Sequence, residues 1–89
     1  LYPHLACGGQ IKKYGDIEAF GKHVKSLRLA KKLSREVLAT QAGIETMQIY
    51  RIEKGLTNTT ISTLYAIAKA LGVPPSRMLD FEIHDHKAK

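Results

Sequence analysis

The chain has 89 residues, of which 44% are hydrophobic, and this size and composition predict a single globular domain rather than a disordered chain. No apolar stretch approaches the roughly 18 residues needed to cross a membrane, no signal peptide is recognisable, and the single cysteine excludes an internal disulfide, so we expect a cytoplasmic protein. The net charge of +6 arises within residues 11–35, because the basic and acidic side chains of residues 36–89 are equal in number. A basic segment of this kind is typical of a protein with a polyanionic partner, and equally of a solvated lysine face.

The first part of the chain is predicted to hold an arm and one helix. One proline and three glycines interrupt residues 1–15, which we assign to an N-terminal arm outside a domain of residues 16–82. A helix over 17–31 follows, with Asp16 as its N-cap and Gly21 as a weak point inside it. Its apolar face recurs at spacings of three, four and three residues: Ile17, Phe20, Val24 and Leu27.

Two short helical patterns hinged on one glycine come next. Ser34 is the predicted N-cap of a helix that Gly43 ends, because glycine adopts the left-handed backbone conformation at low cost. A second helix spans about 45–54 and ends at Gly55. Inward-facing residues on both helices are small or apolar, as two crossing helices require: Leu38, Ala39, Ala42, Ile49 and Ile52. This is the helix-turn-helix pattern, whose second helix enters the major groove of DNA.

The C-terminal part predicts two more helices. One begins at its N-cap Thr60 and runs to Leu71, and Gly72 stops it. A short helix follows Pro74–Pro75, and residues 83–89 form a polar tail. The predicted apolar residues of this part are Ile61, Leu64, Ala68, Leu71, Met78, Leu79 and Phe81. Five short helices without a strand pair predict an all-α fold, a compact bundle.

These elements, taken in order, resemble a known family. From Phe20 to Phe81 the chain resembles the λ-repressor-like, Cro/C1-type helix-turn-helix proteins of the XRE family. The matching segments are VKSLRLAKKLS (24–34), LATQAGI (38–44), IYRIEKG (49–55) and TISTLYAIAKALGVPPSRML (60–79). The resemblance implies a five-helix domain that binds double-stranded operator DNA, usually as a homodimer on a two-fold site. It therefore predicts a repressor-like transcriptional regulator rather than an enzyme.

The resemblance also implies an ion pair between Arg28 and Glu53. Their positions agree, since Arg28 lies beside Leu27 on the first helix and Glu53 follows Ile52 on the third. A planar guanidinium opposite a carboxylate is well suited to a partly buried pair. The alternative is that the two are unrelated surface charges.

The helix over 45–54 is predicted to read bases. The family's base-contacting positions correspond to Thr46, Met47 and Arg51, and the guanidinium fork of Arg51 matches the O6 and N7 atoms of guanine. Gln48 can bond adenine or a phosphate. Glu45 carries a negative charge beside these residues, and we expect it to cap the helix rather than to accept from cytosine.

Four further residues are predicted to contact phosphates. Arg35 lies in the first turn of its helix, where backbone N–H groups also point towards an anion. Lys54, Asn58 and Thr60 lie around the following loop, where the family contacts the DNA backbone again. For Asn58 and Thr60, turn formation and helix capping are alternative roles.

Several other functions are discounted or left open. His84, Asp85 and His86, together with His4 and Cys7, match no structural zinc spacing, so we expect no metal, and no motif indicates a catalytic residue or a cofactor. An antitoxin, or a protein-interaction module with weak DNA binding and a partner such as a toxin, is the alternative function. A restriction–modification controller would have the same sequence features. The expected dimer surface is the last helix with Met78, Leu79 and Phe81, together with the arm of residues 1–15. The alternative is that these apolar residues only close the core.

Overall fold

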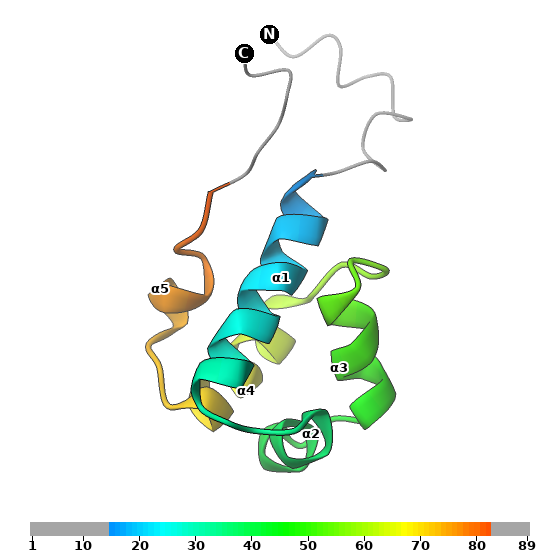
Figure 1. Ribbon diagram of the computed structural model, residues 1–89, viewed down its shortest axis with the longest axis vertical. Coiled ribbons are helices and arrows are strands. Elements are labelled where there is room, and N and C mark those ends of the chain that lie inside the picture. The colour runs from blue at the N-terminus through cyan, green and yellow to red at the C-terminus, as the bar shows by residue number, and fades with distance from the viewer. Residues whose placement is uncertain (1–14, 83–89) are drawn as a thin grey trace, which may run out of the picture.

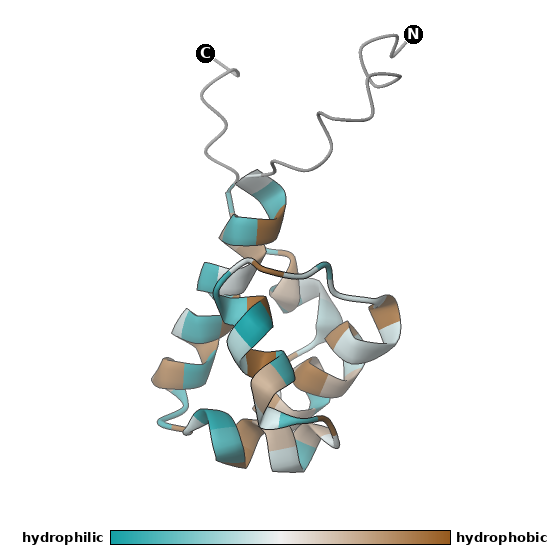
Figure 2. Cartoon of the chain, turned by 90° about the vertical axis from the view of Figure 1, so that its right-hand side faces the viewer, coloured by the Kyte–Doolittle hydropathy of each residue, from teal (hydrophilic) through white to brown (hydrophobic). Residues whose placement is uncertain are grey.

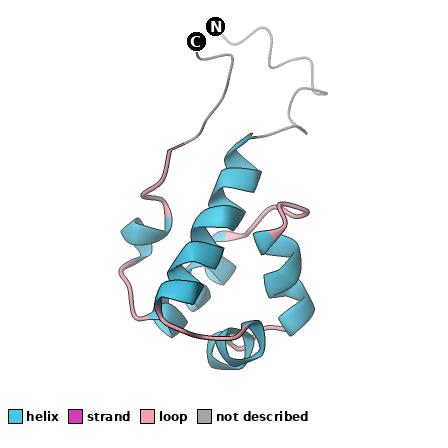
Figure 3. Cartoon of the chain, viewed as in Figure 1, coloured by secondary structure: helices cyan, strands magenta, loops and turns pink. Residues whose placement is uncertain are grey.

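The computed structural model describes residues 15–82, and these form five α-helices joined by loops, with no strand among them (Figure 1; Figure 3). The predicted all-α fold is therefore confirmed. The predicted arm, except for Gly15, and the predicted tail of residues 83–89 lie outside the described residues. The helices are α1 (Gly15–Ala30), α2 (Arg35–Ala42), α3 (Thr46–Glu53), α4 (Ile61–Leu71) and α5 (Pro75–Met78).

Most helix ends lie where the predicted caps place them. The Ser34 hydroxyl accepts a hydrogen bond from the Val37 amide at 3.1 Å, and Thr60 Oγ1 accepts one from the Thr63 amide at 3.2 Å. Each bond satisfies one of the amide groups that a helix start leaves without a partner. Gly43 has a φ angle of 74°, so it turns the chain from α2 towards α3 in a conformation that a side chain would oppose.

One predicted cap is wrong, and a second is confirmed in position but lacks the side-chain hydrogen bond. Helix α1 begins at Gly15, so Asp16 lies inside the first turn, where its carboxylate accepts from the Ile17 amide at 2.8 Å. Glu45 occupies the N-cap position of α3, but its side chain makes no capping hydrogen bond. An acidic side chain at a helix start is favoured by the helix dipole even without such a bond, so sequence alone does not distinguish the two arrangements.

The core lies where the inner faces of the helices meet. Its buried residues are Val24, Leu27, Leu38, Ala39, Ile49, Ile52, Leu64, Ile67, Ala68, Leu71 and Met78. On α4 the expected face is partly wrong, because Ile61 is 68% exposed and Ile67 is fully buried. Ile61 is the first residue of α4, one turn ahead of the part of the helix that packs on its neighbours. Leu79 is 60% exposed, so it does not close the core as Met78 does.

Gly21 marks the close approach of α1 to α3. It is buried, and a Cβ atom placed on it would overlap the carbonyl oxygen of Ile52 and crowd the carbonyl group of Glu53. The sequence suggested only that glycine weakens the helix, whereas the structure shows that the absent side chain permits this packing. The backbone of α1 thus lies directly against the C-terminal turn of α3, the helix expected to read DNA (Figure 1).

Candidate nucleic-acid interface

The two sides of α3 differ in what they contact. Ile49, Ile52 and Glu53 are buried against α1 and α2, and the small Ala39 on α2 is buried with them. Figure 2 looks at the α3 side of the molecule and shows hydrophilic and hydrophobic residues interspersed along its surface. Because a helix turns once in about 3.6 residues, the residues between the buried ones must face outward.

The residues of α3 that are predicted to read bases differ in exposure. Met47 is 52% exposed and Arg51 is exposed, whereas Thr46 and Gln48 are partly buried. Thr46 and Met47 lie in the first turn, the part of a recognition helix that reaches the groove floor. Of the four predicted base readers, Met47 and Arg51 are therefore the exposed ones, and base contact by all four stays a prediction.

The buried side of α3 is held to α1 by the predicted ion pair. Arg28 donates to both carboxylate oxygens of Glu53, from Nε at 2.6 Å and from Nη2 at 3.1 Å. A third bond runs from Arg28 Nη1 to the carbonyl oxygen of Leu33 at 2.9 Å. The side chains are 7% and 1% exposed, so both charges are removed from water and each depends on the other.

Arg35 joins this pair from the start of α2. Its Nε donates to Glu53 Oε1 at 3.0 Å, and its guanidinium lies 5.3 Å from the ring centre of Tyr50. The ammonium of Lys54 lies 5.6 Å from the same ring centre. Two of the predicted phosphate-contacting residues therefore converge on one aromatic side chain, although they come from different helices.

Sequence reasoning missed three contacts around Tyr50 and Glu53. Tyr50 and Lys54 are four residues apart at the end of α3, a spacing that brings side chains together on a helix, so that contact had a local signal. The contacts of Arg35 with Glu53 and Tyr50 cross from α2 to α3, and no spacing along the chain encodes them.

The other two predicted phosphate contacts lie along the loop between α3 and α4. Asn58 and Thr60 are both exposed, and Thr60 also caps α4, so its hydroxyl is already engaged with Thr63. Contact of Asn58 and Thr60 with phosphates stays a prediction.

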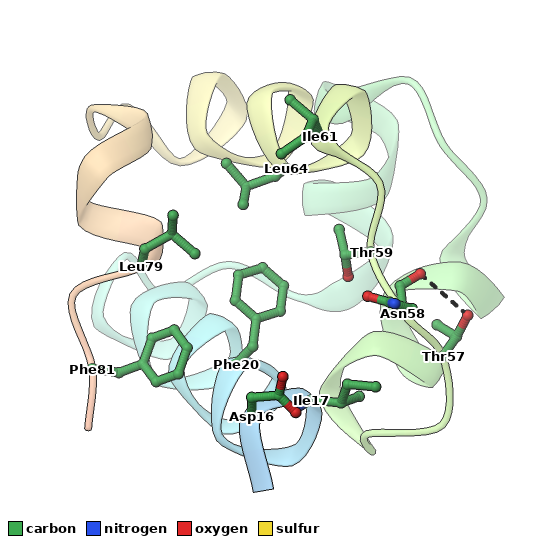
Figure 4. A pocket seen from close by; sticks show the side chains of 10 residues that line it. All are labelled: Asp16, Ile17, Phe20, Thr57, Asn58, Thr59, Ile61, Leu64, Leu79 and Phe81. Carbon is green, nitrogen blue, oxygen red and sulfur yellow. Dashed lines mark hydrogen bonds between the residues drawn. The ribbon is translucent and has the colours of Figure 1, made fainter. Parts of the chain in front are cut away.

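A shallow apolar cavity lies between α1, α4, the loop that precedes α4 and the residues after α5, and Asn58 is among the residues that line it. It has a volume of about 230 Å³ and is lined mainly by apolar side chains from α1, α4 and the residues after α5. Figure 4 shows the rings of Phe20 and Phe81 next to each other in its lining, with Leu79 and Ile61 among the other lining residues. The ring centres of the two phenylalanines are 6.0 Å apart, and His23 packs on Phe81 while its Nε2 lies 2.7 Å from the Arg77 carbonyl oxygen.

Within residues 15–82, no group of three His, Cys, Asp or Glu side chains is arranged to hold a metal ion. The histidines of the C-terminal end, with His4 and Cys7, lie outside this range. No helix of the described part is long and apolar enough to cross a membrane.

The chain matches one family model and is similar to several known proteins. Residues 24–78 match the helix-turn-helix family. The control protein C.BamHI of Bacillus amyloliquefaciens is 40% identical over 63 residues, which cover 70% of this chain and 78% of that protein. An uncharacterized transcriptional regulator in the ATPase CF(0) region of Rhodospirillum rubrum is 43% identical over 54 residues, or 61% of this chain and 50% of that protein. The crystal structure of the restriction–modification controller C.AhdI from Aeromonas hydrophila superimposes with a TM-score of 0.72 and 32% identity, over 73% of this chain and 98% of that one.

Proposed function

The chain belongs to the Cro/C1-type helix-turn-helix family and is a sequence-specific DNA-binding transcriptional regulator, and we propose that it inserts α3 into the major groove of a two-fold operator as a homodimer. One observation carries the proposal. Helix α3 is fixed to α1 by the buried Arg28–Glu53 pair while its opposite side stays accessible. A rigid helix with one free polar side is what base reading needs.

The proposed base contacts are Thr46, Met47, Gln48 and Arg51. Arg51 is exposed one turn behind Met47, so both can face the groove together. The guanidinium fork of Arg51 would recognise guanine, and the apolar end of Met47 would contact a thymine methyl group. Arg35 and Lys54, with Asn58 and Thr60, would fix the helix in register by contacting phosphates.

The proposed dimer uses the apolar end of the bundle. Leu79 and Ile61 are exposed apolar residues at the rim of the cavity, where a second copy could cover them. A regulator on a two-fold site needs two recognition helices about one turn of DNA apart, and a two-fold protein dimer supplies them.

The relatives favour a more specific role, control of a restriction–modification gene set. Two proteins described as controllers match this chain over most of their own length, 78% for C.BamHI and 98% for C.AhdI. No observation favours the alternative of an antitoxin with a toxin partner. We also propose a cytoplasmic location, where a regulator meets its operator.

The proposal is tested by selecting bound sequences from a pool of random duplex DNA and measuring affinity for the winner over a range of salt concentrations. We expect a two-fold symmetric consensus and a steep fall in affinity with salt, about 0.9 logarithmic units per tenfold salt for each phosphate contacted. Enrichment of no sequence, with weak binding that ignores salt, would contradict the proposal.

A further inference from the structure

We propose that Tyr50 is a positioning residue for DNA binding, whose ring holds Arg35 and Lys54 together as one cationic pair for a backbone phosphate. This inference rests on the proposed function and adds a residue to it. Tyr50 lies on α3 directly before Arg51, among the residues proposed to read bases. Its role would be to organise two charges rather than to recognise a base.

The geometry places both cations against one ring. Arg35 Cζ and Lys54 Nζ lie 5.3 and 5.6 Å from the centre of the Tyr50 ring. A cation at such a distance is attracted by the negative face of an aromatic ring. Tyr50 is 38% exposed, so the ring is neither part of the core nor fully solvated, and the two charges lie at the surface beside the recognition helix.

The charges around Glu53 leave Arg35 and Lys54 available to an anion. Glu53 is the buried carboxylate that both arginines contact, and Arg28 already engages both of its oxygens. One carboxylate therefore faces two guanidinium groups, and a positive charge is left over. It is the Arg35 side chain, 31% exposed, rather than the buried Arg28, that meets solvent.

A phosphate is the ligand that suits this arrangement. Arg35 and Lys54 repel each other when the ring holds both, and an anion bound between them relieves that repulsion. Arg35 also lies in the first turn of α2, where the helix dipole favours an anion. The ring restricts the motion of both long side chains, so less of their conformational freedom remains to be lost when DNA binds.

The test compares Tyr50→Leu, which removes the ring, with Tyr50→Phe, which keeps it. The matched control is Tyr65→Leu on α4, since Tyr65 is also a surface tyrosine, 58% exposed. Affinity is measured for the selected operator and for random-sequence duplex, and the melting temperature of each variant shows that it folds. We expect Tyr50→Leu to weaken binding to both DNAs by about three- to tenfold, and Tyr50→Phe and Tyr65→Leu to bind like the unaltered protein.

A double-mutant cycle with Lys54→Gln tests the coupling. Removal of the ring should matter less once the ammonium is gone, so the combined loss should be smaller than the product of the two single losses. Losses that simply multiply would overturn the inference, as would a Tyr50→Phe variant as weak as Tyr50→Leu. If the unaltered protein binds DNA and Tyr50→Leu binds equally well, the inference fails and the proposed function stands. If the unaltered protein binds no DNA, the proposed function fails first.

Discussion

The contact between α1 and α3 and the end of the bundle formed by α1, α4 and α5 are packed in opposite ways. At the first, a glycine brings two backbones together and a buried ion pair joins them. At the second, apolar side chains that include Phe20 and Phe81 line an open cavity of about 230 Å³, and Leu79, which also lines it, is 60% exposed.

The two regions therefore differ in role: one orients α3, and the other exposes apolar side chains. The tight contact fixes the direction of α3, because neither Gly21 nor Glu53 can move without losing packing or a buried charge pair. The open end leaves apolar side chains accessible, which suits association with another copy. Substitutions at the α1–α3 contact should therefore change the stability of the fold, and substitutions at the open end should change the oligomeric state.

The largest effect is expected for Glu53→Ala. This change leaves Arg28 buried without its partner, and breaking such a pair costs about 3–5 kcal/mol. A domain of this size loses roughly 4–8 °C of melting temperature per kcal/mol, so calorimetry should show a large decrease or no folded protein. Glu36→Ala, which alters an exposed acid on α2, is the control and should melt normally. An unchanged melting temperature of Glu53→Ala would reject the structural role of the pair.

Gly21→Ala tests the close contact between α1 and α3 by a change on α1. Alanine favours helix by about 1 kcal/mol over glycine, yet its Cβ would overlap backbone atoms of α3, and we expect a net loss of about 1–3 kcal/mol. The measurement is the free energy of unfolding in urea, with Lys25→Ala at an exposed position of α1 as the control. A stabilised Gly21→Ala variant would show that α1 and α3 are not in close contact.

The accessible side of α3 should respond in DNA binding rather than in folding. Arg51→Ala should weaken the selected operator by about 1–3 kcal/mol and relax the base preference, whereas Lys54→Ala should weaken all DNA about equally. Both residues are exposed, so the melting temperatures of the two variants should stay near that of the unaltered protein. Equal losses on random DNA for the two variants would remove Arg51 from the proposed reading surface.

The smallest effect on stability is expected at the open end. Leu79→Asp alters an exposed residue and should change the free energy of unfolding by no more than about 0.5 kcal/mol. If a second copy covers this surface, the same variant should sediment as a monomer where the unaltered protein is a dimer. Leu29→Asp, on an α1 residue that is 54% exposed, provides the matched control. If the Leu79→Asp variant still sediments as a dimer, the dimer interface does not include Leu79.

The sequence by itself determined the order of the helices and most of their ends. Ser34, Thr60 and the glycines at 43 and 72 act on backbone groups within a few residues, so their effects can be read along the chain. The Arg28–Glu53 contact was also predicted, through the resemblance to a family in which the corresponding residues pair. The base and phosphate contacts stay predictions, since they depend on DNA.

The contacts between helices depend on tertiary packing. Gly21 proved to be a packing position, and Arg35 proved to contact both Glu53 and Tyr50. On α4, Ile67 is buried and Ile61 is exposed. Each of these results depends on how far a helix is rotated and how closely its neighbour approaches. A repeating pattern of apolar residues gives a helix an inner face, but the angle and distance at which two faces meet follow from all the side chains between them.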